Sequence, residues 1–396
     1  MGEDIYVNRG EIVEWIYGLE TVPTTITTAT DEDNNESSCV IGAGFKGSTY
    51  LGPINTNSNE DDDKIHNYDH SHIAMTYVAL CTLQALGDDL SRIDKHAILS
   101  TLRGLQKPNG SFVALSPTTT TAAATTDDDK KDDVEAEDDC DLRFMYAAIA
   151  VWYILTSNNN DHHNEQYINI ETATQYILSC KSYEGALGLT PGREGHGGST
   201  FCGIASLYLL GVLDDVMERE ELHGWRDELI YWCVMRQKSL MKKNEVVNGN
   251  DDNGYYVQEE EEEQPAGMVG RPNKKEDTCY SYWIGGTLHL LSSSHLIDGW
   301  ALREYVLKCQ SPYGGFGKVV GAMPDLLHSF YSMAWLTLSS EDGCCDDDDD
   351  EDDDENEGND ENNEVYESEM RIQVRESIGK LSKLDCALGM CAKRIR

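Results

Sequence analysis

The stretch CQSPYGGFG, residues 309–317, is a turn that returns along the chain and shows how the chain is built. LQKPNGSF at 105–112 and CKSYEGALG at 180–188 match it, each with an apolar first residue and glycine in sixth place. Every copy follows a segment with apolar residues at three- and four-residue intervals, which is typical of an amphipathic helix. With the acidic insertions set aside, the unit spans about 50 residues, a length typical of helical repeats.

The helical segments of this repeat are of two kinds. One kind is rich in small and aromatic residues and is apolar on most faces; it covers 72–86, 143–155, 199–213, 279–291 and 327–338. The other kind is amphipathic and covers 10–20, 93–106, 170–180, 221–237 and 299–310. A helix that is apolar all round has to be surrounded by other elements, whereas an amphipathic helix can face water on one side.

Concentric rings of helices satisfy both kinds of segment. We therefore predict an all-α fold, an α/α toroid in which inner helices line a cavity and outer helices cover them. Strand signals are scarce, because the apolar runs are long and rarely alternate with polar residues. Segment 10–20 has outer-helix character, with its glycine turn at 42–47. No inner-type segment precedes it, so we expect the toroid to lack its first inner helix.

The negative charge of the chain is concentrated in segments of low complexity. The formal net charge is −41 over 396 residues, yet residues 341–364 alone carry 16 acidic side chains and no Lys or Arg. Two more acidic segments lie within 117–139 and 243–265. Such runs repel themselves and bury little apolar surface, so solvated loops are favoured over an acidic docking tail. We accordingly predict a toroid domain over 1–340, an acidic linker over 341–364 and a C-terminal extension with helical periodicity over 365–396.

Composition also limits the location and the partners. No apolar stretch is long enough to span a bilayer, and MGEDIYVNRG at the N-terminus lacks the features of a signal peptide. The 12 cysteines are scattered through apolar segments, which is typical of reduced thiols. We therefore expect a cytoplasmic protein without a stable membrane anchor. No basic stripe suits nucleic acid, so we expect no nucleic-acid partner.

Asp277, Cys279 and His328 supply one carboxylate, one thiol and one imidazole. These groups bind zinc in proteins, and three protein ligands leave the fourth tetrahedral position open, as in catalytic sites. Taken singly, each residue has a simpler interpretation: a small buried cysteine, a core histidine and the N-cap of a helix. Together they predict a metal centre, and the surrounding motifs support that interpretation.

Several motifs resemble those of the β subunits of the protein prenyltransferases. They are GRPNK at 270–274, DTCY at 277–280, HGGSTFC at 196–202 and PDLLH at 324–328. The resemblance covers most of residues 5–340 apart from the acidic insertions. The fold of that family is the α/α toroid predicted above, so the resemblance and the repeat agree on the architecture.

The resemblance implies two adjoining sites. In the first, a zinc ion, one per chain, would be bound by Asp277, Cys279 and His328, with the thiol of a substrate cysteine as the fourth ligand. In the second, an isoprenoid diphosphate would be bound, and stabilised as it leaves, by His196, Arg271, Lys274 and Tyr280. His196 begins a predicted helix, where free backbone N–H groups favour an anion. The pair of cations in the GRPNK turn would by itself indicate only a solvated surface turn.

Lys318, ten positions before His328, separates branches of the family. The resemblance implies that an aspartate at this position recruits magnesium in farnesyltransferases, whereas a lysine replaces that metal in type I geranylgeranyltransferases. Lys318 would therefore be catalytic, together with Tyr280, and magnesium would not be required. The resemblance also implies that Leu327 lines the pocket for the last peptide side chain, where the farnesyl enzymes have an aromatic residue. Tyr331 is an aromatic residue that some farnesyl enzymes share.

Further residues match positions that bind the two substrates. His72 and Arg143 match residues that hold the peptide carboxylate through water. The isoprenoid pocket would be lined by aromatic and small residues, namely Tyr77, Tyr146, Cys202 and Trp283. Singly, each of these would indicate core packing, because a cavity wall and a core look alike in sequence.

The implied activity is transfer of a geranylgeranyl group from geranylgeranyl diphosphate to the cysteine of a C-terminal CaaX sequence, typically CaaL, as in small GTPases. It requires a separate α subunit, so a heterodimer is implied. Three alternatives stay open: a farnesyltransferase β subunit, a Rab geranylgeranyltransferase β subunit, and an inactive truncated toroid acting as a binding scaffold. Lys318 argues against the first, the PDLLH and HGGSTFC motifs against the second, and the complete ligand set against the third.

Overall fold

The computed structural model describes residues 8–21, 24–29, 36–47, 70–115, 140–157, 167–238, 266–341 and 384–391. The acidic segments predicted at 117–139 and 243–265 lie outside these residues, as does the predicted linker after Glu341 and the first part of the extension, 365–383.

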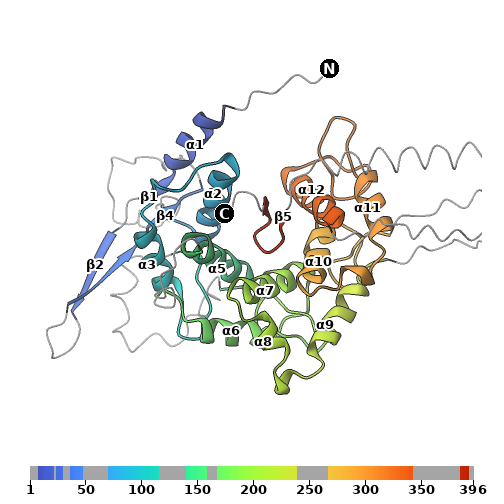
Figure 1. The fold of residues 1–396 in the computed structure, drawn as a ribbon, viewed down its shortest axis with the longest axis horizontal. Coiled ribbons are helices and arrows are strands. Elements are labelled where there is room, and N and C mark those ends of the chain that lie inside the picture. Colours follow the sequence, from blue (N-terminus) through green and yellow to red (C-terminus); the bar gives the residue numbers. More distant parts are fainter. Residues whose placement is uncertain are drawn as a thin grey trace, which may run out of the picture. The chain divides into compact units, whose positions relative to one another are not determined.

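The described chain is mostly helical, and its helices follow the order that the repeat predicts (Figure 1). The helices are α1 (Arg9–Tyr17), α2 (Ile73–Leu86), α3 (Lys95–Leu105), α5 (Leu142–Thr156), α6 (Ile170–Ser179), α7 (Gly197–Leu209), α8 (Leu213–Met217), α9 (Trp225–Val234), α10 (Cys279–Leu290), α11 (Gly299–Lys308) and α12 (Leu326–Glu341), with short 3-10 helices η4 (Glu220–Leu222) and η5 (Ser294–Leu296). The strands are β1 (Glu20–Thr21), β2 (Thr24–Ala29), β3 (Glu36–Ile41), β4 (Gly44–Phe45), β5 (Leu384–Asp385) and β6 (Met390–Cys391).

The chain divides into two compact units. Unit 1 comprises Met1–Gly195, Cys202–His223 and Ala387–Arg396. Unit 2 comprises His196–Phe201 and Gly224–Cys386. Helix α7 starts in unit 2 and continues in unit 1, and unit 2 interrupts the sequence of unit 1.

In unit 1, the burial of α5 and α3 agrees with the two predicted kinds, whereas α2 leaves Met75 and Val78 exposed. Helix α5 buries 12 of its 15 residues and packs against α2 and α3. Helix α3 buries 6 of its 11 residues, on one face, and begins where the Asp94 side chain accepts a hydrogen bond from the Ala97 N–H at 3.0 Å. The first helix is therefore surrounded and the second covers it, as the apolar patterns of the two segments predict.

In unit 2, α10 and α12 lie side by side, with α9 against α10 and α11 against α12 (Figure 1). The second half of α12 is buried, with Trp335 fully enclosed. The first half exposes apolar side chains at Leu326, Phe330 and Met333. This spacing of four and three residues places them on one face of the helix.

The repeated turns are confirmed. The same isolated antiparallel bridge closes each of them, at Gln106↔Phe112, Lys181↔Leu187 and Gln310↔Phe316. Their central glycines have nearly the same left-handed backbone, with φ of 90°, 89° and 98° at Gly110, Gly185 and Gly314. A fourth bridge, Gln237↔Met268, stands at the same place after α9 and encloses the acidic segment 243–265.

Some predicted boundaries differ from the structure because a glycine intervenes. The segment predicted over 199–213 ends at Leu209, followed by Gly211 with φ of 72°. The segment predicted over 221–237 becomes η4 and α9, separated by Gly224 with φ of 83°. The antiparallel pair β2–β3 was not expected; β2 has the sequence TTITTA, whose β-branched residues favour strands.

The first described helix, α1, precedes the glycine turn at 42–47, within which β4 pairs with β1 through Glu20↔Phe45. This matches the outer-helix character predicted for 10–20. The lack of a preceding inner helix stays a prediction.

The described part of the predicted extension is a hairpin, so helical periodicity was the wrong interpretation there. Strands β5 and β6 pair around a turn that includes Gly389, with φ of 63°. Cys386, Ala387 and Leu388 between the strands are buried. The domain boundary predicted at 340 leaves these residues outside the toroid, whereas the structure includes them in the core.

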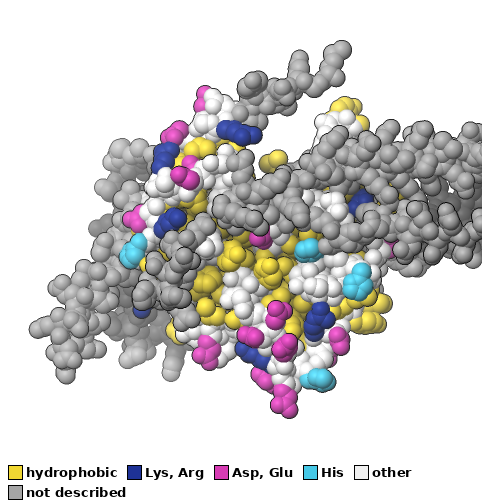
Figure 2. All heavy atoms as spheres, in the orientation of Figure 1, with side chains coloured by type: hydrophobic (Ala, Val, Ile, Leu, Met, Phe, Trp, Pro, Cys, Tyr) yellow, Lys and Arg dark blue, Asp and Glu magenta, His cyan; other side chains and the backbone are white. Residues whose placement is uncertain are grey.

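The surface of the described residues is acidic in places. Figure 2 shows acidic side chains over α8 and η4, where Asp214, Asp215 and Glu218 are exposed. Within the described ranges, each helix is too short or too polar to cross a lipid bilayer.

Candidate metal centre and the residues around it

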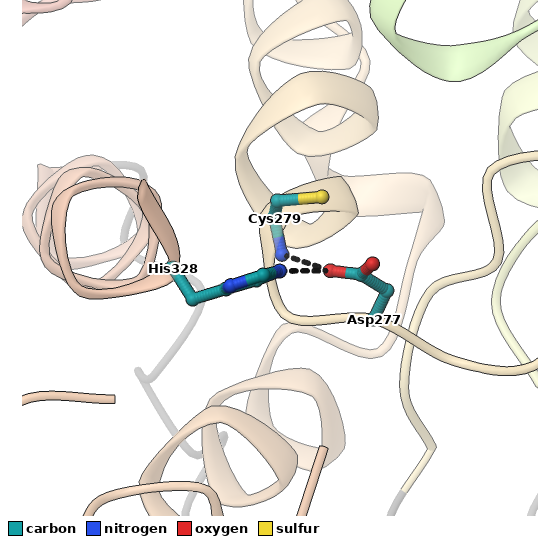
Figure 3. Close-up of side chains that lie close together, drawn as sticks. All are labelled: Asp277, Cys279 and His328. Carbon is teal, nitrogen blue, oxygen red and sulfur yellow. Dashed lines mark hydrogen bonds and ion pairs between the residues drawn. The ribbon is translucent and has the colours of Figure 1, made fainter. Parts of the chain in front are cut away.

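Unit 2 brings the three predicted metal ligands together. Cys279 is the first residue of α10 and His328 the third of α12, and Asp277 lies just before α10, with the three side chains facing one another (Figure 3). One ligand atom from each lies within 4.8 Å of the others, and the Asp277 and Cys279 side chains are buried. A tetrahedral zinc centre with bonds of about 2.0–2.3 Å would draw such atoms to about 3.5 Å. The donor set and its spacing therefore fit a metal ion.

Backbone hydrogen bonds tie the start of α10 to the loop that precedes α12. The Thr278 N–H donates to the Lys318 carbonyl at 3.0 Å, and its hydroxyl donates to the Gly317 carbonyl at 2.9 Å. Gly317 lets this loop fold back on itself, because a Cβ there would lie 2.5 Å from the Ala322 carbonyl oxygen. Two segments that are distant in sequence are thus held at a fixed separation.

Each group at the centre is oriented by a partner. Asp277 Oδ1 accepts a hydrogen bond from the Cys279 N–H at 3.0 Å and lies 3.2 Å from His328 Nε2, while its Oδ2 lies 3.2 Å from Lys318 Nζ. His328 Nδ1 lies 2.6 Å from Asp325 Oδ2. A carboxylate on the second ring nitrogen is the usual support for a metal-binding histidine, and it leaves Nε2 for the metal.

Electrostatics keep the Cys279 thiol protonated without a metal. Burial, and then the negative charge of Asp277, raise the pKa of Cys279 far above its usual range. A bound dication reverses this balance, because it favours the thiolate. Hydrogen bonds from the His328 backbone and ring lower the pKa of the Asp325 carboxyl, which therefore stays ionised.

The predicted diphosphate residues also lie in unit 2, and two of them form a pair. His196 Nε2 and the Tyr280 hydroxyl are 2.9 Å apart, with ring centroids 5.5 Å apart. His196 Nδ1 accepts a hydrogen bond from the Gly198 N–H at 3.1 Å, so in the neutral ring Nε2 carries the proton and donates to Tyr280. The Tyr280 hydroxyl hydrogen is then available for another acceptor. Burial raises the pKa of Tyr280 to about 12, which keeps it a donor near neutral pH.

A tight backbone contact places this pair beside the GRPNK turn. The Gly197 N–H donates to the Gly270 carbonyl at 3.0 Å. A Cβ on Gly270 would lie 2.0 Å from the Tyr280 ring, so only glycine fits against that ring. Arg271 is half-buried and its charge acts on Tyr280, whereas Lys274 is exposed on the same turn. The structure thus gathers two cations, a phenol and an imidazole on neighbouring segments.

Two of the predicted pocket residues in unit 1 are held by the C-terminal hairpin. The Tyr77 and Tyr146 hydroxyls are 3.0 Å apart. Tyr77 donates to the Leu388 carbonyl at 2.8 Å and Tyr146 to the Ala387 carbonyl at 2.7 Å. Cys202 is buried, and burial raises the pKa of its thiol to about 12.

The predicted peptide residues of unit 1 meet at one aromatic ring. His72 packs edge-on against Phe144 at 5.6 Å, and the Arg143 guanidinium lies 5.7 Å from the same ring. Arg143 also pairs with Asp141 at 2.6 Å while its side chain stays 63% exposed. His72 is the N-cap of α2, with Nδ1 accepting from the Ala74 N–H. The roles of both residues in peptide binding stay predictions.

The remaining predicted residues lie on α10 and α12 in unit 2. Trp283 packs against Tyr331 with ring centroids 4.3 Å apart, so the two form part of one aromatic cluster. Leu327 is exposed next to His328. The cluster includes Tyr282, whose hydroxyl donates to the Cys386 carbonyl at 2.7 Å, a contact that the sequence did not predict. Asp325 was also missed, although a carboxylate three residues before a helical histidine is a detectable signal.

Comparison with known proteins agrees with this architecture. The model of the prenyltransferase alpha-alpha toroid domain matches residues 3–389. Geranylgeranyl transferase type-1 subunit beta of Arabidopsis thaliana is 34% identical, over 85% of this chain and 74% of the relative. Its Dictyostelium discoideum counterpart is 31% identical, over 84% of this chain and 77% of the relative. A farnesyltransferase subunit beta of Pisum sativum matches at 30% over only 57% of this chain and 40% of the relative, so it is the less extensive likeness.

The solved structure of Candida albicans protein geranylgeranyltransferase-I complexed with GGPP has a similar fold. The TM-score is 0.62, at 21% identity, over 98% of this chain and 83% of that one. The chain therefore belongs to the prenyltransferase α–α toroid family, and within it to the β subunits of type-1 geranylgeranyl transferases. Its class is that of the protein prenyltransferases, which are enzymes.

Proposed function

We propose that this chain is the β subunit of a zinc-dependent type I protein geranylgeranyltransferase, which joins a geranylgeranyl group to the cysteine of a CaaX sequence. The observation that carries the proposal is the cluster of Asp277, Cys279 and His328, with the Lys318 ammonium 3.2 Å from Asp277. A carboxylate, a thiolate and an imidazole suit zinc, and three ligands leave one position for a substrate thiol. When bound, zinc would hold that thiol as a thiolate near neutral pH.

In the reaction, the substrate sulfur forms a bond to C1 of the isoprenoid as the bond from C1 to the diphosphate oxygen breaks. Charge then accumulates on the leaving diphosphate. The Tyr280 hydroxyl hydrogen, freed by the His196 contact, can donate to that anion, and Arg271 and Lys274 provide positive charge on the adjacent turn. Such preorganised donors and charges stabilise a transition state without further reorganisation. A thioether and free diphosphate result.

The Lys318 ammonium, 3.2 Å from Asp277 Oδ2, would add a positive charge next to the proposed metal ligands. Its side chain is 61% exposed, so it can move from Asp277 toward a bound anion. This supports the role of Lys318 in place of magnesium. Tyr77, Tyr146, Cys202 and Trp283 as pocket residues, and His72, Arg143 and Leu327 as peptide residues, complete the proposal, together with an α subunit as partner and a cytoplasmic location.

The test is co-expression with a type I α subunit. Transfer of geranylgeranyl and of farnesyl to a peptide ending in CaaL would be measured with zinc present and magnesium chelated. We expect geranylgeranyl transfer without magnesium, and a magnesium requirement in Lys318→Asp. His328→Ala should lose both zinc, measured by atomic emission, and transfer. A wild-type complex that holds no zinc and transfers no lipid would refute the proposal.

A further inference from the structure

Unit 2 contains a cavity whose lining, apart from Lys274, has no role in the predicted chemistry. Its volume is about 560 Å³. It lies between the segment that follows α9 and the turn before α10. It is lined by Met235, Arg236, Gln237, Lys238, Val269, Pro272, Asn273, Lys274 and Lys275.

The lining is strongly basic. Four of its side chains are cationic, namely Arg236, Lys238, Lys274 and Lys275, and none is acidic. Lys238 is offset by Glu276, 3.1 Å away and outside the lining. Within the described part of the chain, Lys274 and Lys275 have no carboxylate within ion-pair distance. In a chain with a net charge of −41, such a concentration of positive charge favours a bound anion.

The backbone beneath these cations is held rigidly. Gln237 and Met268 form an antiparallel bridge, the Val269 N–H donates to the Arg236 carbonyl at 2.9 Å, and the Lys238 N–H donates to the Gly267 carbonyl at 3.0 Å. A second bridge, Val269↔Glu276, closes the turn.

The Arg236 side chain is itself positioned. Its Nε–H donates to the Trp232 carbonyl at 3.2 Å, and its guanidinium lies 4.9 Å from the centre of the Trp232 ring. These two contacts hold the Arg236 guanidinium in a defined position beside the cavity.

We propose that this cavity is a second anion site that takes inorganic diphosphate, the anion that the proposed reaction releases. The identity of the anion rests on the proposed function. Lys274 belongs both to the lining and to the predicted diphosphate set, three residues from Arg271 on the same turn. An anion that leaves Arg271 and Tyr280 can therefore keep its contact with Lys274 while it reaches the other cations of the cavity. Multiple compact ammonium charges and a guanidinium fork suit phosphate oxygens.

The test measures diphosphate binding by calorimetry to the zinc-loaded complex with its α subunit, while a non-hydrolysable geranylgeranyl diphosphate analogue fills the transfer site. We expect diphosphate still to bind, with an affinity that falls as salt rises. Arg236→Gln with Lys275→Gln should raise the Kd about tenfold, the loss expected for one or two charge-assisted hydrogen bonds. The matched control is Lys308→Gln, an exposed cation at the end of α11 outside the lining, and it should leave the Kd unchanged.

Two results would overturn the proposed anion site. One is that diphosphate does not bind once the geranylgeranyl diphosphate analogue is bound. The other is that the double variant, shown by circular dichroism to be folded, has the same Kd as the wild type. Should the double variant not fold, Lys275→Glu alone, at an exposed position, gives the same comparison. Binding to phosphatidic acid vesicles without binding of free diphosphate would identify a lipid headgroup instead and overturn the proposal.

A separate experiment tests the acidic segment, because the carboxylates of Glu259 to Glu263 can compete with diphosphate for the same cations. Diphosphate that binds only after these five residues are changed to Gln would overturn the proposal in favour of an internal anion. Geranylgeranyl transfer is measured on the same samples. If transfer is lost but diphosphate still binds in the cavity, the proposed transferase function alone is refuted. If transfer is intact but diphosphate does not bind in the cavity, the second anion site alone is refuted.

Discussion

Gly270→Ala should disturb the pair of Tyr280 and His196 through a single added methyl group. The new Cβ would lie 2.0 Å from the Tyr280 Cζ and 2.5 Å from its hydroxyl oxygen. Ordinary contacts begin near 3.4 Å, so the ring has to move by more than an ångström. Gly270 does not have positive φ, and alanine is therefore compatible with its backbone. The loss of stability in Gly270→Ala therefore comes from the steric clash with the Tyr280 ring.

The size of the effect follows from two terms. Overpacking of this kind costs about 1–3 kcal/mol. Displacement of the ring also breaks the 2.9 Å contact to His196, and a hydrogen bond contributes about 1 kcal/mol. For a cooperative unit of this size, each kcal/mol lowers the melting temperature by about 2–4 °C. If the tyrosine donates to the leaving diphosphate, a loss of about 1.4 kcal/mol of that interaction slows transfer about tenfold.

The assay is a double-mutant cycle by scanning calorimetry and single-turnover transfer. Gly270→Ala is compared in the wild type and in Tyr280→Ala, where the added methyl group meets no ring. We expect the destabilisation to vanish in the second background, with a coupling free energy of about 1–3 kcal/mol. Gly10→Ala is the matched control, because its Cβ meets only Asn8 Oδ1, at an ordinary 3.6 Å. Equal destabilisation in both backgrounds, or none in the wild type, would refute the reasoning.

Three further outcomes are expected. Tyr77→Phe removes the hydrogen bond to the Leu388 carbonyl and should destabilise unit 1 by about 1 kcal/mol, measured by calorimetry. Glu14 has a pKa lowered from 4.5 by its hydrogen bond to Arg92, so the ion pair stabilises the fold above that pH and is lost as the pH falls through the lowered value. The difference in melting temperature between wild type and Glu14→Gln should therefore shrink below pH 4.5. Zinc at about 100 times its Kd should stabilise the wild type by about 2.7 kcal/mol but not His328→Ala, measured by the shift in melting temperature.

Each of these has a result that contradicts it. Tyr208→Phe changes an exposed tyrosine of α7 and should leave the free energy of unfolding unchanged. If it lowers that free energy as much as Tyr77→Phe does, the Tyr77 result does not report on the hydrogen bond to Leu388. A difference for Glu14 that is constant from neutral to acid pH would show that charge plays no part. An equal zinc shift in His328→Ala would place the zinc elsewhere on the chain.

Local signals in the sequence were sufficient for the repeated turns and for the pair of Asp277 and Cys279. The turns at 105–112, 180–188 and 309–317 repeat a glycine with left-handed backbone, and that requirement is visible in the sequence. Asp277 and Cys279 are two residues apart, so one helix start brings them together, and the resemblance supplied His328. These features depend on spacing within one segment or on a motif.

Other features depend on contacts between distant residues, which spacing does not reveal. The hairpin around Cys386 has helical periodicity in its sequence, yet tertiary hydrogen bonds to tyrosine hydroxyls keep it extended. The cavity beside Lys274 arises where the ends of a long insertion are bridged by Gln237 and Met268. In both cases the partner lies tens or hundreds of residues away, so it could be found only in the folded chain.

The order of synthesis gives the buried hairpin a consequence for how the protein is made. Tyr77 lies 311 residues before Leu388, the residue whose carbonyl its hydroxyl binds. At about 5–20 residues per second, the ribosome needs about 15–60 s to cover that distance. Unit 2 is complete by Cys386, before the last part of unit 1 has been made. The half of the protein that is translated first is therefore the half that finishes folding last, and a nascent chain stalled before residue 387 would expose its earliest helices to chaperones.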